Sequence, residues 1–194
     1  MGFLLENCII SPLTQEIIDS CNKFDCGNED LNDFFMNEAV PYAEQLLGKT
    51  YCFRLEKQPD AIVCAFTVSN DSIRISLLPN SRGKKVKKDI PRAKHIEKYP
   101  AVLIGRLGIN IDFKRKGIGT ELMNFIKGWF VHPMNKTGCR FLVVDAFNEP
   151  TPLSYYEKNE FNYLFSSEEQ EAVSVHRSGE LKTRLMYFDL ITLK

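Results

Sequence analysis

The sequence lacks a signal for export or membrane insertion at its N-terminus. The stretch MGFLLENCII has no basic residues ahead of its apolar run, and that run is too short for a signal peptide or a transmembrane helix. Glu6 also occupies the position at which an N-myristoylation signal has Ser or Thr. We therefore expect a cytoplasmic protein.

Paired metal-ligating residues and an excess of charge are also missing. None of the six cysteines forms a Cys-x-x-Cys pair, and the three histidines are isolated from one another. We predict free thiols of a reducing compartment in preference to disulfides, and no metal site. Lys and Arg number 25, as do Asp and Glu, so any affinity for a polyanion has to come from a local patch.

Length and composition are those of one globular domain. The 194 residues are 44% hydrophobic and 26% charged, and no repeat or low-complexity linker divides them. We predict a single domain over residues 1–194. Between Arg82 and Lys98, eight Lys or Arg accompany two Asp or Glu, which predicts a basic surface loop inserted at about residues 80–98.

The order of the predicted elements is mixed α/β. SPLTQEIIDSC predicts a helix capped by Ser11 with Pro12 at its first position, and the segment after Cys26 predicts a helix capped by Asn28 that Pro41 kinks or splits. TYCFRLE and AIVCAFTVS predict a hairpin. Further strands are predicted at AVLIGRLGINI, RFLVVDAF, FNYLF and LKTRLMYFDLITL, with helices at 118–130 and PTPLSYYEKN. We expect a sheet with parallel character around the central helix.

The stretch FKRKGIGTEL carries the clearest chemical signal. Gly117 and Gly119 follow three cations and open the predicted helix, so backbone N–H groups gather at a positive helix terminus and predict a phosphate or pyrophosphate site. A Walker loop is excluded because Gly119 is followed by Thr120. A dinucleotide fingerprint is excluded because its third glycine position holds Leu122. A tight turn with solvated cations is the alternative.

Two motifs resemble those of the GCN5-related N-acetyltransferase (GNAT) superfamily. RLGINIDFKRKGIGTELM resembles the family's strand followed by Gln/Arg-x-x-Gly-x-Gly/Ala, with Lys114 in the Gln/Arg position. VVDAFNEPTPLSYYEKNEF resembles its second signature, with Tyr155 and Tyr156 in the Phe-Tyr positions and Glu160 replacing a glycine before Phe161. Over roughly residues 20–190, the chain looks like the acetyltransferase toxins of bacterial toxin–antitoxin pairs.

The resemblance implies a GNAT fold, in which a twisted sheet of parallel and antiparallel strands has helices on both faces and is splayed at the acetyl-CoA site. It implies acetyl-CoA as co-substrate, with direct acetyl transfer to an amine. The central strand would hold pantetheine and the acetyl oxygen, the loop would hold the pyrophosphate, and an asparagine would bond to pantetheine or to the incoming helix. The residues so implicated are Leu107, Gly108, Ile109, Lys114, Arg115, Lys116, Gly117, Ile118, Gly119, Thr120 and Asn148.

Tyr156 is the predicted catalytic residue. A phenol with a pKa of about 10 stays protonated at neutral pH and can donate a proton to the departing thiolate; the alternative is a packing aromatic whose hydroxyl only bonds to the cofactor. Many family members use a glutamate on the central strand as the base, but AVLIGRLGIN offers only Arg106. This favours a weakly basic α-amine, as on aminoacyl-tRNA, over a lysine side chain, whose pKa is about 10.4.

The basic insert bears on the choice of acceptor. Its cations predict contacts with an RNA backbone, and the absence of interleaved aromatic residues favours contacts with phosphates over contacts with bases. The alternative is a solvated loop that only aids solubility. The candidate nucleic-acid contacts are Lys84, Lys85, Lys87 and Lys88, with Arg82, Arg92 and Lys94 in the same segment.

Three functions are compatible with these patterns. The first is a toxin-like acetyltransferase that acts on the aminoacyl end of charged tRNA. The second acetylates a small amine, a peptide or a protein N-terminus, and the third is a non-catalytic acyl-CoA-binding module. Candidate protein partners are an antitoxin repressor, if the toxin interpretation holds, and a second copy of the chain paired through the strand RLMYFDLI.

Overall fold

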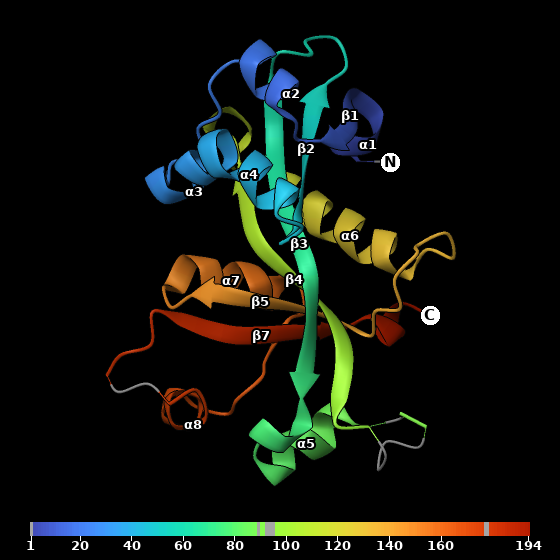
Figure 1. Ribbon diagram of the computed structural model, residues 1–194, viewed down its shortest axis with the longest axis vertical. Helices are drawn as coiled ribbons and strands as arrows, with labels where there is room; N and C mark the ends of the chain where they lie inside the picture. Colours follow the sequence, from blue (N-terminus) through green and yellow to red (C-terminus); the bar gives the residue numbers. More distant parts are fainter. Residues whose placement is uncertain (1, 89, 92–95, 177–178) are drawn as a thin grey trace. The chain divides into compact units, whose positions relative to one another are not determined.

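The computed structural model describes residues 2–88, 90–91, 96–176 and 179–194 (Figure 1). The chain divides into two compact units, the first comprising Met1–Ser69 and Ile104–Trp129 and the second Asn70–Leu103 and Phe130–Lys194. Strands β3 (Ile62–Arg74) and β4 (Lys98–Ile109) run through both units. Over the described residues the strands form one sheet in the order β1-β2-β3-β4-β5-β7-β6. A single domain over residues 1–194 stays a prediction.

The first unit contains five of the described helices and the beginning of the sheet. Its elements, besides its shares of β3 and β4, are α1 (Phe3–Asn7), β1 (Cys8–Pro12), α2 (Gln15–Ser20), α3 (Glu29–Asp33), α4 (Ala39–Glu44), β2 (Lys49–Leu55) and most of α6 (Ile118–Val131). β1 pairs antiparallel with β2, and β2 pairs antiparallel with β3, as the predicted hairpin requires.

Successive side chains along the strands of this unit point to opposite faces of the sheet, and both faces are covered by other parts of the unit. Tyr51 and Phe53 of β2 contact Trp129 and Phe125 of α6, with ring centroids 4.8 and 5.0 Å apart. Cys52 between them points the other way, into a core cluster with the aromatic residues that follow α3. Figure 1 accordingly shows α3 and α4 on one side of β2 and β3, and α6 on the other.

The N-terminal half of the chain corrects one sequence prediction and confirms another. Ser11 and Pro12 do not start a helix, because they lie in β1; Thr14 caps α2 by accepting a hydrogen bond from the Ile17 N–H. Pairing with β2 overrides the local helix signal, and an edge strand tolerates proline. Asn28 caps α3 as predicted, and a π-helical segment (Phe34–Glu38) separates α3 from α4.

The second unit holds the C-terminal half of the sheet. Its elements, besides its shares of β3 and β4, are α5 (Asn80–Val86), β5 (Phe141–Phe147), α7 (Pro150–Lys158), β6 (Asn162–Tyr163), α8 (Glu168–Ser174) and β7 (Thr183–Asp189). β5 pairs parallel with β4 and antiparallel with β7. The predicted mixed α/β class, with parallel pairing beside the central helix, is therefore confirmed.

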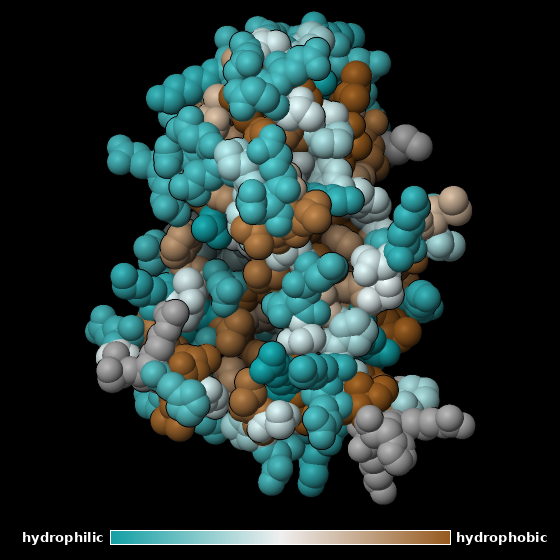
Figure 2. All heavy atoms as spheres, in the orientation of Figure 1, coloured by the Kyte–Doolittle hydropathy of each residue, from teal (hydrophilic) through white to brown (hydrophobic). Residues whose placement is uncertain are grey.

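The basic insert is not a loop throughout. Residues 80–86 form α5, because Val86 and Gly83 are buried and Arg82 donates hydrogen bonds to the Tyr163 and Leu164 carbonyl oxygens. Lys84, Lys85 and Lys88 are exposed and Lys87 is half-buried, and Figure 2 shows hydrophilic side chains over α5 on the visible face. Arg92 and Lys94 lie outside the described residues.

The C-terminal strand is shorter than predicted, since a 3-10 turn (Leu190–Leu193) follows β7, and the FNYLF strand is reduced to β6. Four elements were missed from the sequence: α1, β1, α5 and α8. The six cysteines are free thiols, three of them buried.

Candidate active site

The loop between β4 and α6 has the backbone of an anion site. Arg115 and Gly117 both adopt left-handed conformations, with φ of 60° and 80°. The Thr120 and Glu121 N–H groups donate to the Gly117 carbonyl, so the N–H groups of Gly117 and Ile118 precede the hydrogen-bonded ladder of α6. Such groups at the positive end of a 14-residue helix favour a bound anion.

The three cations of this loop play different parts. The Lys114 ammonium lies beside Gly27, 3.2 Å from the position that a Cβ on Gly27 would have. The pKa of Asp25 is lowered mainly by the hydrogen bond from the Gly27 N–H, and the charge of Lys114 lowers it further. Lys116 Nζ donates to the Asp112 carbonyl at 2.8 Å. Arg115 is exposed and has no partner among the described residues. Arg115 is therefore the cation available to a phosphate.

Replacing Arg115 by alanine is expected to raise the Kd for acetyl-CoA by roughly 10- to 100-fold, the worth of a charge-assisted hydrogen bond. Alanine bears the same left-handed strain as arginine, so the backbone change is small. Lys116→Ala, measured beside it by calorimetry, is the matched control and should shift the Kd by only a few-fold. Equal effects of the two substitutions would mean that the loop binds by net charge alone.

At the end of β4, from Leu107 to Ile109, the side chains are packed against the protein, so a ligand there would bind to the backbone. A Cβ on Gly108 would lie 3.0 Å from the Phe35 ring and 3.2 Å from Cys26 and Phe24, so only glycine fits without a shift. Leu107 and Ile109 alternate with it and are half-buried. Pairing of β4 with β5 runs from Ala101↔Phe141 to Leu103↔Val143, and β4 continues to Ile109. The predicted splay of the sheet beyond that point stays a prediction.

Tyr156 lies on α7 among other aromatic rings. Its ring centroid is 5.1 Å from Tyr155 and 5.4 Å from Phe161. Burial raises the pKa of Tyr156 to about 12, although part of the residue remains accessible. Its hydroxyl has no hydrogen-bond partner among the described residues. The phenol is thus a protonated donor with an unused proton.

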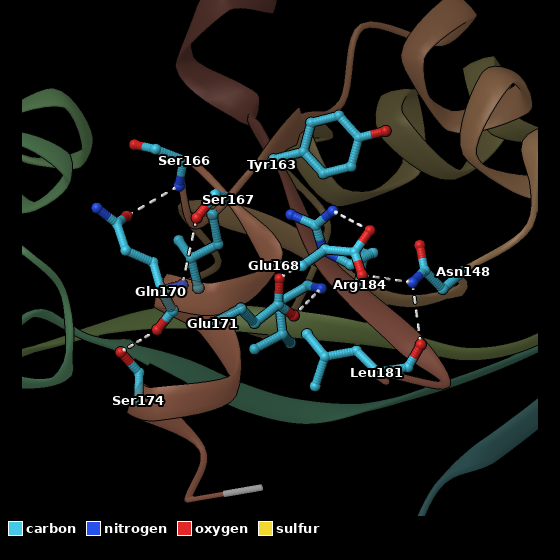
Figure 3. Close-up of polar contacts among 12 residues, drawn as sticks. Asn148, Tyr163, Ser166, Ser167, Glu168, Gln170, Glu171, Ser174, Leu181 and Arg184 are labelled. Carbon is cyan, nitrogen blue, oxygen red and sulfur yellow. Dashed lines mark hydrogen bonds and ion pairs between the residues drawn. The ribbon is translucent and has the colours of Figure 1, made fainter. Parts of the chain in front are cut away.

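Asn148 is held by the segment that carries α8 (Figure 3). Its Nδ2 donates to Glu168 Oε2 and to the Leu181 carbonyl, each at 3.0 Å. Glu168 in turn reaches Arg184 at 3.4 Å. Because both amide hydrogens are used, the group that Asn148 can still offer to a ligand is its carbonyl oxygen, as an acceptor.

The second unit also contains a cavity of about 230 Å³, and none of the predicted site residues lies in its wall. Its walls include His132, Cys139, Arg140 and Lys194. Arg140 is already paired with Asp189 at 2.7 Å, so its charge is not free for a ligand in this cavity. Over the described part of the chain, no cluster of His, Cys, Asp and Glu could hold a metal ion, and no helix is long and apolar enough to cross a membrane.

Comparison with solved structures agrees with this architecture. AtaT complexed with acetyl-methionyl-tRNAfMet is 20% identical with a TM-score of 0.66, covering 96% of this chain and 97% of that chain. A tyrosine-to-phenylalanine mutant of KacT is 18% identical with a TM-score of 0.67, covering 97% and 98%. An AtaT mutant toxin with the same kind of substitution, bound to the C-terminus of the antitoxin AtaR and acetyl-CoA, is 18% identical with a TM-score of 0.61, covering 97% and 96%.

The chain has the fold of AtaT and KacT. The predicted resemblance to such toxins is confirmed at the level of the fold. No protein-family model matches the chain, and no curated protein matches it.

The structure places the predicted residues in two groups. The β4 backbone and the loop from Lys114 to Thr120 belong to the first unit, while Asn148 and Tyr156 belong to the second. Within the first unit, the residue that follows β4 is held to β3, because the Asn110 N–H donates to the Val63 carbonyl at 2.9 Å. The assembly of both groups around one ligand stays a prediction.

Glu160 lies where the GNAT signature that the sequence resembles has a glycine, and it has a left-handed φ of 64°. A residue with a side chain is destabilised by about 1–2 kcal/mol in this conformation. Glycine avoids that strain, but the greater conformational entropy of its unfolded chain offsets about 0.5–1 kcal/mol of the gain. We expect Glu160→Gly to raise the free energy of unfolding in urea by about 0.5–1 kcal/mol. Glu160→Ala keeps the strain and should give no gain; a loss of stability in Glu160→Gly would contradict the strain argument.

Proposed function

We propose that this protein is an acetyl-CoA-dependent N-acetyltransferase that moves an acetyl group directly to the α-amine of aminoacyl-tRNA. The observation that carries the proposal is the loop before α6, where Arg115 and Gly117 have left-handed backbones directly ahead of a 14-residue helix, an arrangement that suits a pyrophosphate. The fold shared with AtaT, solved with acetyl-methionyl-tRNAfMet, supports an aminoacyl acceptor.

Acetyl-CoA would supply a thioester carbonyl and a thiolate leaving group. Arg115 and the N–H groups of Gly117 and Ile118 would hold its pyrophosphate, and the β4 backbone from Leu107 to Ile109 would hold the pantetheine arm. An N–H of β4 would stabilise the oxygen that becomes negative when the carbonyl is attacked.

The acetyl transfer requires few groups on the protein. A neutral amine attacks the carbonyl, so an N–C bond forms and the C–S bond breaks. Tyr156 donates its proton to the sulfur, the nitrogen loses one proton to water, and the Tyr156 phenolate takes a proton back from water, which restores the enzyme. No carboxylate lies on β4 to act as a base, which suits an α-amine with a pKa of about 7.7–8.0 or lower, because much of it is neutral at pH 7.

The test of the proposal is acetyl transfer from labelled acetyl-CoA into three pools: mixed charged tRNA, protein and small amines. We expect label in the aminoacyl ester fraction, strongly reduced in Tyr156→Phe. Label only in the protein or small-amine pools would favour the second function. Acetyl-CoA binding without label in any pool would favour a binding module.

The basic insert gives a second test of the RNA acceptor. Reversing charge at Lys84, Lys85, Lys87 and Lys88 should strongly lower transfer to charged tRNA and weaken its salt dependence, because these cations would contact phosphates. The matched control reverses four exposed lysines elsewhere, Lys49, Lys57, Lys158 and Lys182, with the same change in net charge. Equal losses in both variants would assign the effect to net charge.

The neighbours also suggest a protein partner. AtaT was solved with the C-terminus of its antitoxin AtaR, and we include an antitoxin of that kind among the expected partners of this chain. A homodimer remains a further candidate.

A further inference from the structure

Arg106 is a cation fixed on the strand that precedes the predicted acetyl-binding backbone. It is exposed, and its guanidinium carbon lies 5.0 Å from the centroid of the Phe34 ring. Phe34 opens the π-helical segment and is itself held edge-on by Phe35 and Tyr42, at 5.6 and 5.7 Å. The guanidinium thus rests on a rigid aromatic platform, so little rotamer entropy is left to lose when it binds a ligand.

The charge of Arg106 is not neutralised within the described residues. Its Nη1 donates to the neighbouring Gly105 carbonyl at 2.9 Å, and no carboxylate pairs with it there. A guanidinium has five N–H donors, and contact with a ring face uses none of them. Most of the planar fork is therefore open to an anion, and phosphate is an oxyanion that such a fork binds with two parallel hydrogen bonds.

The position of Arg106 identifies which anion it meets. It directly precedes Leu107, whose backbone is predicted to hold the acetyl group, and its guanidinium lies on the face of β4 that packs against Phe34, so an anion bound by Arg106 would lie along that face close to the predicted acetyl-binding backbone. An aminoacyl ester has no free carboxylate, and the anion closest to its amine is the phosphodiester next to the esterified nucleotide. We infer that Arg106 binds this phosphodiester and makes the protein select aminoacylated RNA ends over simple amines. This inference rests on the proposed function.

A series of minimal acceptors tests the inference. Aminoacyl-adenosine lacks the phosphodiester and aminoacyl-CpA has it, and kcat/KM is measured on both for wild type, Arg106→Lys and Arg106→Met. Wild type should prefer the dinucleotide by roughly 10- to 100-fold. Arg106→Met should lose that preference while keeping wild-type activity on aminoacyl-adenosine, and Arg106→Lys should retain part of it.

Two outcomes would overturn the inference. One is a preference that survives in Arg106→Met; the other is an equal loss on both acceptors together with a lower Tm, which would give Arg106 a packing role over Phe34. Methionine also covers the ring, so an unchanged Tm is expected.

Equilibrium binding separates this inference from the proposed function. Stable amide-linked analogues of the two acceptors are titrated against wild type and Arg106→Met without acetyl-CoA. A wild-type preference for the CpA analogue that Arg106→Met lacks supports the Arg106 contact even if no acceptor is acetylated. Equal binding of both analogues to both proteins would reject it, whether or not acetyl transfer is found.

Discussion

Tyr156→Phe is expected to lower kcat for acetyl transfer by roughly 10²- to 10⁴-fold, the usual worth of a general acid. The substitution removes one oxygen and keeps the ring that packs against Tyr155 and Phe161, so the Kd for acetyl-CoA and the Tm should change little. Single-turnover kinetics with labelled acetyl-CoA measure the chemical step directly. Tyr155→Phe, on the same helix, is the matched control and should lose less than tenfold.

The pH profile gives an independent check on the same residue. Because burial raises the pKa of Tyr156 to about 12, its hydroxyl keeps the proton throughout the range from pH 6 to 10. We expect kcat/KM to rise with pH as the acceptor amine loses its proton, at about pH 7–8, and then to stay level. A fall in kcat/KM with a midpoint below pH 10 that Tyr156→Phe abolishes would contradict this protonation state.

Glu171→Gln is expected to lower the free energy of unfolding by about 3–5 kcal/mol, because it removes the buried carboxylate that pairs with Arg184 and leaves that buried cation only the longer ion pair with the exposed Glu168. Glu171 is 2% exposed and Arg184 is 8% exposed, and their ion pair is 2.8 Å long. The other Glu171 oxygen accepts from the Leu185 N–H at 2.6 Å, which fastens α8 to β7 (Figure 3). Thermal melting should show a decrease in Tm of about 6–20 °C.

Two variants make this stability prediction specific. Glu168→Gln removes an exposed charge that lies 3.4 Å from Arg184, and should cost at most about 1 kcal/mol. The double variant Glu171→Gln with Arg184→Met keeps an acceptor for the Leu185 N–H and removes the stranded cation, so it should recover most of the loss. A double variant no more stable than Glu171→Gln alone would show that the loss came from packing.

Local patterns were enough to predict the elements around the candidate site. The helical period after Gly117, the cap at Asn28 and the apolar strands β2 to β5 each depend on residues close together in the chain. The missed elements depend on distant partners. The Leu4 N–H of α1 donates to Glu121, 117 residues away, and Arg82 fixes α5 to carbonyls more than 80 residues away.

The predictions for the site residues likewise divide into those that depend on local sequence and those that depend on contacts between distant residues. The sequence by itself determined the glycine turn and the mixed α/β class, because turn chemistry and side-chain periodicity act over a few residues. The catalytic role of Tyr156 follows from the resemblance to the GNAT family and stays a prediction. Only the tertiary structure decided that Arg115, rather than Lys114 or Lys116, is free for a phosphate, that Asn148 has its carbonyl oxygen left to offer, and that the Tyr156 proton is held more tightly than usual. Hydrogen bonds, desolvation and ion pairs depend on which side chains meet in space, and folding brings those together from distant parts of the chain.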